Sequence, residues 1–224
     1  RVVFSVVGVC QRQPSTASPL TADVKNTPMN ASSMAEHHWI VVVTLAGMVA
    51  GVGCSKEAGV ATSNDKLFAL CEDRNATPQA IETLLTTGAD IHARDKSGMT
   101  PLMLASLLNP NPEVVKTLLN VDAKIEARNP NRLTPLMLAA LLNSNPEVIK
   151  TLLEAGADIE ARNANKLTPL MLAAWSNSNP KVVEVFLYAG ADIHAKDEDG
   201  KTPLMIAAAS KSSSPKVIES LLNA

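Results

Sequence analysis

A four-residue motif, Thr-Pro-Leu-Met, recurs at one fixed interval and restricts the folds open to this chain more than any other feature. It begins at Thr100, Thr134, Thr168 and Thr202, and the differences 134−100, 168−134 and 202−168 are each 34 residues. A repeat of this length indicates a solenoid, in which each unit buries its apolar face only against its neighbours. The sequence therefore predicts an array of similar units.

Each unit contains the signals for two short helices. Thr100 can cap the first helix while Pro101 occupies its first turn, where the missing N–H costs nothing. A second start follows at Asn111 and Pro112, and a cap-and-proline pair of this kind recurs in every unit. A glycine after the second helix suits a left-handed residue at its end, although one unit carries Asp122 there. Each unit is thus predicted to be helix, helix and extended finger.

The order of these motifs resembles a known repeat family. Residues 95–102 read Asp-Lys-Ser-Gly-Met-Thr-Pro-Leu, residues 114–119 read Val-Val-Lys-Thr-Leu-Leu, and Gly-Ala-Asp follows the second helix in several units. From about Asn64 to Ala224 this pattern is similar to that of ankyrin repeats. The resemblance implies an all-α ankyrin-repeat solenoid of about five helix-turn-helix units with short β-like finger loops. It also implies a partner-binding surface on the finger tips and inner helices. The units are placed at about 64–99, 100–133, 134–167, 168–201 and 202–224.

Two features depart from the family pattern. The period is 34 residues instead of the roughly 33 that is usual, and the extra residue falls between the two helices. Methionine replaces the histidine that normally follows Thr-Pro-Leu, at Met103, Met137, Met171 and Met205. Because that histidine hydrogen-bonds within the turn in the family, we expect thioether packing to replace a polar link here.

The segment ahead of the repeats has a different character. Residues 1–33 show no periodicity and are interpreted as an unstructured or spurious upstream segment, whereas residues 34–53 resemble a secretory signal peptide. From Trp39 to Gly53 the chain carries no charge over 53−39+1 = 15 residues, fewer than the roughly 20 that span a bilayer. Residues 51–55, Gly-Val-Gly-Cys-Ser, resemble a bacterial lipoprotein cleavage box, which implies lipidation of Cys54 and a linker over 54–63. An uncleaved anchor, or an untranslated leader ahead of a cytosolic protein, are the open alternatives.

Composition and charge argue against several classes of function. A net charge of −2 and an aromatic content of 3% give no basis for a nucleic-acid partner. The three cysteines form no C-x-x-C pair, which disfavours a zinc site, and Cys71 falls where the other units have alanine, so we expect a buried structural thiol. His92, Glu126, Glu160 and His194 form a column with one residue per unit, too widely spaced to share a metal ion. We expect no enzymatic activity, no cofactor and no metal.

The candidate partner-binding residues form three columns with one member per unit. The first is a column of cations, which could recognise an acidic peptide or could pair with neighbouring carboxylates. The second is an apolar stripe on the finger tips. The third lies on the inner helices, where Trp175 interrupts a leucine pattern and is a candidate hot spot, while Leu108 and Leu142 are expected to pack between units. The columns are Arg94, Arg128, Arg162 and Lys196; Met99, Leu133 and Leu167; and Leu107, Leu141 and Trp175.

These features together predict a protein–protein interaction scaffold. We expect a monomer that captures a protein partner on its concave face and contacts a membrane only through a lipid anchor at Cys54. The expected location is the bacterial cell envelope, in the periplasm or on the outer membrane. The alternatives are a cytosolic ankyrin protein, a secreted effector, or a non-catalytic module of an enzyme complex.

Overall fold

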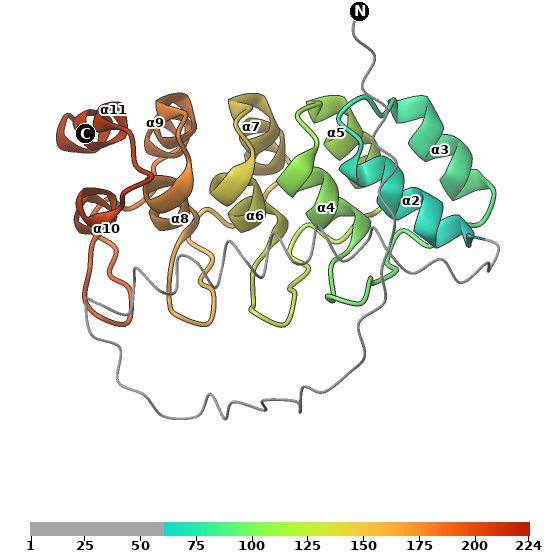
Figure 1. Cartoon of the computed structure of the whole chain (residues 1–224), viewed down its shortest axis with the longest axis horizontal. Coiled ribbons are helices and arrows are strands. Elements are labelled where there is room, and N and C mark those ends of the chain that lie inside the picture. Colours follow the sequence, from blue (N-terminus) through green and yellow to red (C-terminus); the bar gives the residue numbers. More distant parts are fainter. Residues whose placement is uncertain (1–60) are drawn as a thin grey trace, which may run out of the picture. The chain divides into compact units, whose positions relative to one another are not determined.

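The computed structural model describes residues 61–224, which include the whole predicted repeat region, residues 64–224 (Figure 1). The predicted upstream segment, the signal peptide and the lipidation site at Cys54 lie outside the described residues, as does most of the linker. Among the described helices, none has the length and apolar character needed to cross a membrane.

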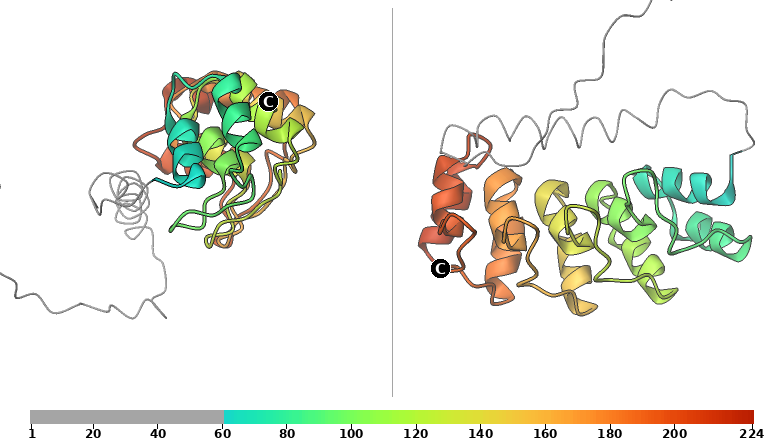
Figure 2. Two further views of the ribbon diagram at one scale, coloured as in Figure 1. Left: turned by 90° about the vertical axis from the view of Figure 1, so that its right-hand side faces the viewer. Right: turned by 90° about the horizontal axis from the view of Figure 1, so that it is seen from below.

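Ten helices make up the described part of the chain, and no strand is found there, which confirms the all-α prediction. The first helices of the units form one row and the second helices form another, with a finger loop at the edge of the array after each of the first four pairs (Figures 1 and 2). The first helices, which we call the inner helices, lie side by side along the array, and so do the second helices, which we call the outer helices. The pairs are α2 (Ser63–Glu72) and α3 (Pro78–Thr86); α4 (Pro101–Leu108) and α5 (Pro112–Asn120); α6 (Pro135–Leu142) and α7 (Pro146–Glu154); α8 (Pro169–Ser176) and α9 (Pro180–Tyr188); and α10 (Pro203–Ala209) and α11 (Pro215–Leu222).

The helices begin where the cap-and-proline pairs predict. Thr100 Oγ1 accepts a hydrogen bond from the Met103 N–H at 3.3 Å, and Asn111 Oδ1 accepts one from the Glu113 N–H at 3.0 Å. The first unit differs, because Thr62 caps α2 and forms a reciprocal pair with Asp65, whose carboxylate accepts the Thr62 N–H at 2.9 Å. The array thus begins with a polar helix start, which suits a terminal unit facing water.

The repeated methionines keep part of the polar link that the family histidine provides. Met103 and Met171 are fully buried, and their sulfur atoms accept the backbone N–H of Thr100 at 3.5 Å and of Thr168 at 3.4 Å. The prediction of thioether packing is therefore correct but incomplete. A weak sulfur acceptor adds to the packing at the start of these two helices.

A row of buried asparagines between the two helices joins the second, third and fourth units to the unit before each of them. Asn143 donates from Nδ2 to the carbonyl of Ser106 at 2.9 Å and to that of Asn109 at 2.8 Å, and its Oδ1 accepts the Asn145 N–H at 3.0 Å. Asn177 makes the same bonds one unit later. We call Asn109, Asn143 and Asn177 the asparagine ladder. Because it occupies the connector that is longer than usual, it gives the additional residue of the 34-residue period a structural role.

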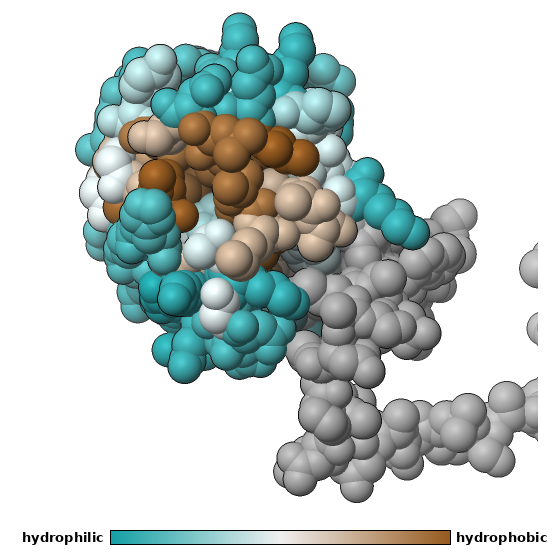
Figure 3. All heavy atoms as spheres, turned by 90° about the vertical axis from the view of Figure 1, so that its left-hand side faces the viewer, coloured by the Kyte–Doolittle hydropathy of each residue, from teal (hydrophilic) through white to brown (hydrophobic). Residues whose placement is uncertain are grey.

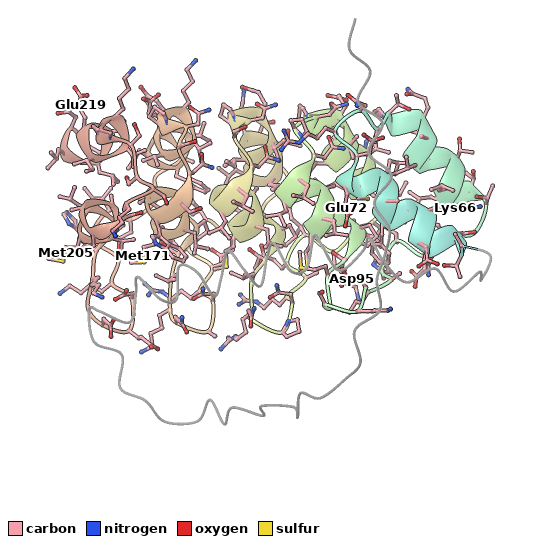
Figure 4. The ribbon with its side chains drawn as sticks, viewed as in Figure 1. Lys66, Glu72, Asp95, Met171, Met205 and Glu219 are labelled. Atoms are coloured by element: carbon pink, nitrogen blue, oxygen red, sulfur yellow. The ribbon has the colours of Figure 1, made fainter. Side chains whose placement is uncertain are left out.

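The last unit leaves an apolar face uncovered. The methionines of the three preceding units are buried with no exposed surface, whereas Met205 is 58% exposed and Leu222 of α11 is 65% exposed. Seen end-on, this side of α10 and α11 forms a continuous apolar patch (Figure 3), and Met171 and Met205 can be compared in Figure 4. The same face of each earlier unit is covered by the unit that follows it.

We predict that Asn143→Ala destabilises the array strongly. The substitution leaves two buried carbonyl groups and one N–H without their side-chain partner, which costs roughly 2–3 kcal/mol. The free energy of unfolding, measured with urea, should fall by that amount. Asn131→Ala, at an exposed finger-tip position, is the matched control and should change it by less than about 0.5 kcal/mol. Equal effects from the two substitutions would contradict a structural role for the ladder.

Candidate partner-binding surface

Four finger tips project from the edge of the array, and a carboxylate or amide side chain shapes each one. We define them as finger 1 (94–99), finger 2 (128–133), finger 3 (162–167) and finger 4 (196–201). In finger 1, Asp95 Oδ1 accepts the N–H groups of Ser97 and Met99, both at 2.8 Å (Figure 4). In finger 3, Asn163 Oδ1 accepts those of Asn165 and Leu167. The tips therefore have a defined backbone geometry.

The predicted cation column links the fingers to one another. Arg94 Nη1 donates to the carbonyl of Arg128 at 3.0 Å, Arg128 Nη1 to that of Arg162 at 2.8 Å, and Arg162 Nη1 to that of Lys196 at 2.7 Å. Each arginine also donates to a carbonyl four residues later in its own finger. We call these residues the arginine ladder. Its arginines are part of the framework, and they form none of the four ion pairs found in the described region, in contrast to the predicted alternative of pairing with neighbouring carboxylates.

The two glutamates of the predicted histidine–glutamate column, Glu126 and Glu160, have a similar role. Glu126 Oε1 accepts the N–H of Asp158 at 2.9 Å, and Glu160 Oε1 accepts that of Asp192 at 2.8 Å. These hydrogen bonds join neighbouring units in the segments that lead from the second helix to each finger tip. Within the described residues, no group of histidine, cysteine and carboxylate side chains lies close enough to hold a metal ion.

The structure corrects part of the predicted apolar surface. Met99, Leu107 and Leu141 are 4%, 3% and 3% exposed, so they belong to the packed interior and do not form a contact surface. Met99 is covered from the next finger, whose Asn129 Nδ2 lies 3.5 Å from the methionine sulfur. Leu107 and Leu141 lie on inner helices that contact the inner helix of the next unit. Their side chains would face water on an isolated helix, but neighbouring units cover them in the array.

The other apolar candidates remain partly accessible. Leu133 and Leu167 are half-buried on fingers 2 and 3. Trp175 is also half-buried and packs, together with Leu167, against Met171, Ala195 and Ile206. In contrast to the prediction that it packs between units, Leu142 is 47% exposed, whereas Leu108 is half-buried.

The finger tips differ in charge. Fingers 2 and 3 each carry two cations and no carboxylate, for a net charge of +2 each. Finger 1 has a net charge of 2−1 = +1, and finger 4 has 2−3 = −1. Sequence reasoning missed two of the cations responsible, Arg132 and Lys166, both exposed at the tips. The available signal was that these residues stand where fingers 1 and 4 have Gly98 and Gly200.

The only cysteine in the described residues is not poised for reaction. Cys71 is buried, as predicted, and this burial raises the pKa of its thiol to about 12, with the nearby Glu72 carboxylate adding to the shift. Burial also raises the pKa of Glu72, and Asp95 contributes (Figure 4). A thiol that stays protonated at neutral pH is a poor nucleophile and metal ligand.

A family model described as ankyrin repeats (3 copies) matches residues 67–163 and 160–224, which is most of the chain. No curated protein matches the sequence.

Proposed function

The chain belongs to the ankyrin-repeat family, and from that membership we propose that its array binds a partner protein through the finger tips and the adjoining edge of the inner helices. Ankyrin repeats are protein–protein interaction scaffolds. In the family the contact residues come from these same two regions. The proposal for this chain therefore depends on which of its residues are accessible there.

One observation carries the proposal: the units are alike where they pack and different where they face solvent. The three middle units share a buried Pro-Leu-Met turn, a capping threonine and a member of the asparagine ladder. The finger tips, by contrast, range in net charge from +2 to −1. Packing conditions explain the identical positions but not the variation of the tips, which is expected of a surface that recognises one partner.

The arginine ladder supports the proposal through its effect on rigidity. Hydrogen bonds of 2.7 to 3.0 Å between successive fingers hold the tips in fixed relative positions before a partner binds. A surface that is already ordered loses less conformational entropy on binding. We propose a contact surface that keeps Arg94, Arg128, Arg162, Lys196, Leu133, Leu167 and Trp175, and that gains Leu142.

We further propose that the protein is anchored to the bacterial cell envelope by a lipid on Cys54. The support is the sequence alone, in which an uncharged run from Trp39 to Gly53 leads directly to Cys54. A lipid chain would place the array at a membrane without a spanning helix. A cytosolic protein, a secreted effector and a non-catalytic module of an enzyme complex are the other outcomes of the tests below.

We predict that a crosslinking pull-down from the native host recovers a protein partner, and that Trp175→Ala or Arg128→Glu reduces its recovery. Trp175 supplies apolar contact area, and Arg128 supplies charge beside the tip of finger 2. Lys150→Glu, on the outer helix α7 where the lysine is 55% exposed, is the matched control and should leave recovery unchanged. The melting temperature of each variant should be compared, since both test residues also make internal contacts. Unchanged recovery with both test variants would contradict the proposed surface.

We predict that the full chain, expressed in its host, incorporates a fatty-acid analogue at Cys54. Cys54→Ala should abolish the label, whereas Cys10→Ala should retain it, because only Cys54 follows the apolar run. Absence of label on the wild type, or label that survives Cys54→Ala, would rule out the lipid anchor. The binding function of the array would be unaffected by that result.

A further inference from the structure

We propose that fingers 2 and 3 bind an acidic segment of the partner protein, and that Arg132 and Lys166 are specificity-determining residues for it. The inference rests on the proposed function and names the chemistry of the partner. It derives from three properties of these two tips: their backbone conformation, their charge and their spacing.

The backbone at both residues is one that favours glycine. Arg132 has φ 61° and Lys166 has φ 59°, while Gly98 and Gly200 have φ 74° and 77° at the same position of fingers 1 and 4. A side chain in this left-handed region is strained by contact between Cβ and the backbone. Two units thus keep a strained residue where two other units keep glycine.

Packing explains the glycine of finger 1 but not the cations of fingers 2 and 3. A Cβ atom on Gly98 would lie 2.8 Å from Cδ of Pro130 on the next finger, so no side chain fits there without movement. Finger 3 has Ala164 in place of that proline, so the equivalent position of finger 2 faces a smaller neighbour. Space therefore permits a side chain, and it does not require one. Strained residues that packing does not require often occur at functional sites.

The cations on these tips are not paired with carboxylates within the described structure. Arg128, Arg132, Arg162 and Lys166 form none of its ion pairs. The hydrogen bonds of Arg128 and Arg162 all come from Nη1, so the other guanidinium N–H groups can donate to a ligand. Four cations on two adjacent tips, in a chain with a net charge of −2, provide a local positive field.

The spacing of the fingers suits an extended protein segment. Neighbouring units of packed helices lie about 8–10 Å apart. A segment in the extended polyproline II conformation advances about 3.1 Å per residue with three residues per turn, so carboxylates at every third position would face one side and meet successive tips. The negative tip of finger 4, with Glu198 and Asp199, would repel such a segment and limit it to fingers 1 to 3.

Nucleic acid fits the same surface less well. The four tips contain no aromatic side chain on which a base could stack. The same negative tip of finger 4 would also repel a continuous phosphate backbone, and a short positive stretch offers few phosphate contacts. We therefore assign the tips to carboxylate groups of a protein, with nucleic acid as the competing outcome of the test.

The test measures binding of the full chain to a short labelled peptide with glutamate at every third position, by fluorescence anisotropy at low salt. The double variant Arg132→Gly/Lys166→Gly should weaken binding roughly tenfold, since each exposed charge pair contributes up to a fewfold change in Kd. The same variant should melt at an equal or higher temperature, because glycine relieves the strain and still supplies the carbonyl that the ladder arginine binds.

Two controls separate charge from backbone strain. Asp122→Gly relieves a left-handed residue, φ 69°, outside the finger tips, and should raise the melting temperature without changing the peptide Kd. Lys116→Gln/Lys150→Gln removes two exposed cations from the outer helices and should also leave Kd unchanged. A tenfold loss confined to the finger-tip variant supports the inference.

Two results would overturn the inference: a Kd unchanged in Arg132→Gly/Lys166→Gly, or tighter binding of a single-stranded oligonucleotide than of the peptide. Failure of the proposed function has a different signature. If the wild type captures a host partner and the double variant captures it equally well, the scaffold function stands and the acidic-segment assignment fails. If the peptide binds as expected but no host partner is ever captured, the acidic-segment assignment stands and the proposed scaffold function fails.

Discussion

The structure depends on hydrogen bonds from side chains of one unit to backbone carbonyls of a neighbouring unit. The repeat helices run from seven to ten residues, too short to be stable alone in water. Their stability must come from neighbours, and the bond from Asn143 Nδ2 to the Asn109 carbonyl joins residues 34 positions apart, which is the length of one unit. A bond of that span ties the position of each unit to the position of the previous one.

Two ladders act at different levels of the same array. The asparagine ladder lies between the two rows of helices and is buried, whereas the arginine ladder runs along the fingers near solvent. Breaking the hydrogen bonds of a buried asparagine side chain is costly, because the groups left without a partner cannot bond to water instead. The bonds from arginine are charge-assisted, and they can fix the fingers although these contain no strand. The helical layers thus set the spacing of the fingers, and the arginines fix the position of each finger relative to the next.

This arrangement gives the variation among the tips a functional meaning. Because the framework is the same in fingers 1, 2 and 3, the partner-facing differences reduce to a few side chains on a fixed support. Arg132 and Lys166 are the clearest of these, because their backbone conformation costs free energy and their cationic groups form no ion pair within the described residues. Such a position has a cost in every folded molecule, and binding is the property that would offset it.

The fold could be predicted from the sequence, but much of the surface could not. Helix starts such as Thr100 with Pro101 depend on neighbours within four residues, so local rules were enough. The burial of Leu107 and Leu141, and the exposure of Leu142, depend on where other units lie, which periodicity along one helix does not reveal. The bond partners of Asn143 and Arg128 were missed for the same reason, since each lies one unit away. Arg132 and Lys166 could have been found by comparing them with Gly98 and Gly200, because aligned units reveal a residue that replaces glycine.

The most direct test of a rigid, ladder-supported binding surface is backbone amide hydrogen exchange of the full chain, followed residue by residue with and without a captured partner. We predict that, in the free protein, the ladder-bound fingers exchange more slowly than unsupported loops would, and that partner binding slows exchange further at the tips of fingers 2 and 3 while α5 and α7 are unchanged. Slowing confined to α5 and α7, with fast exchange throughout the fingers, would contradict it.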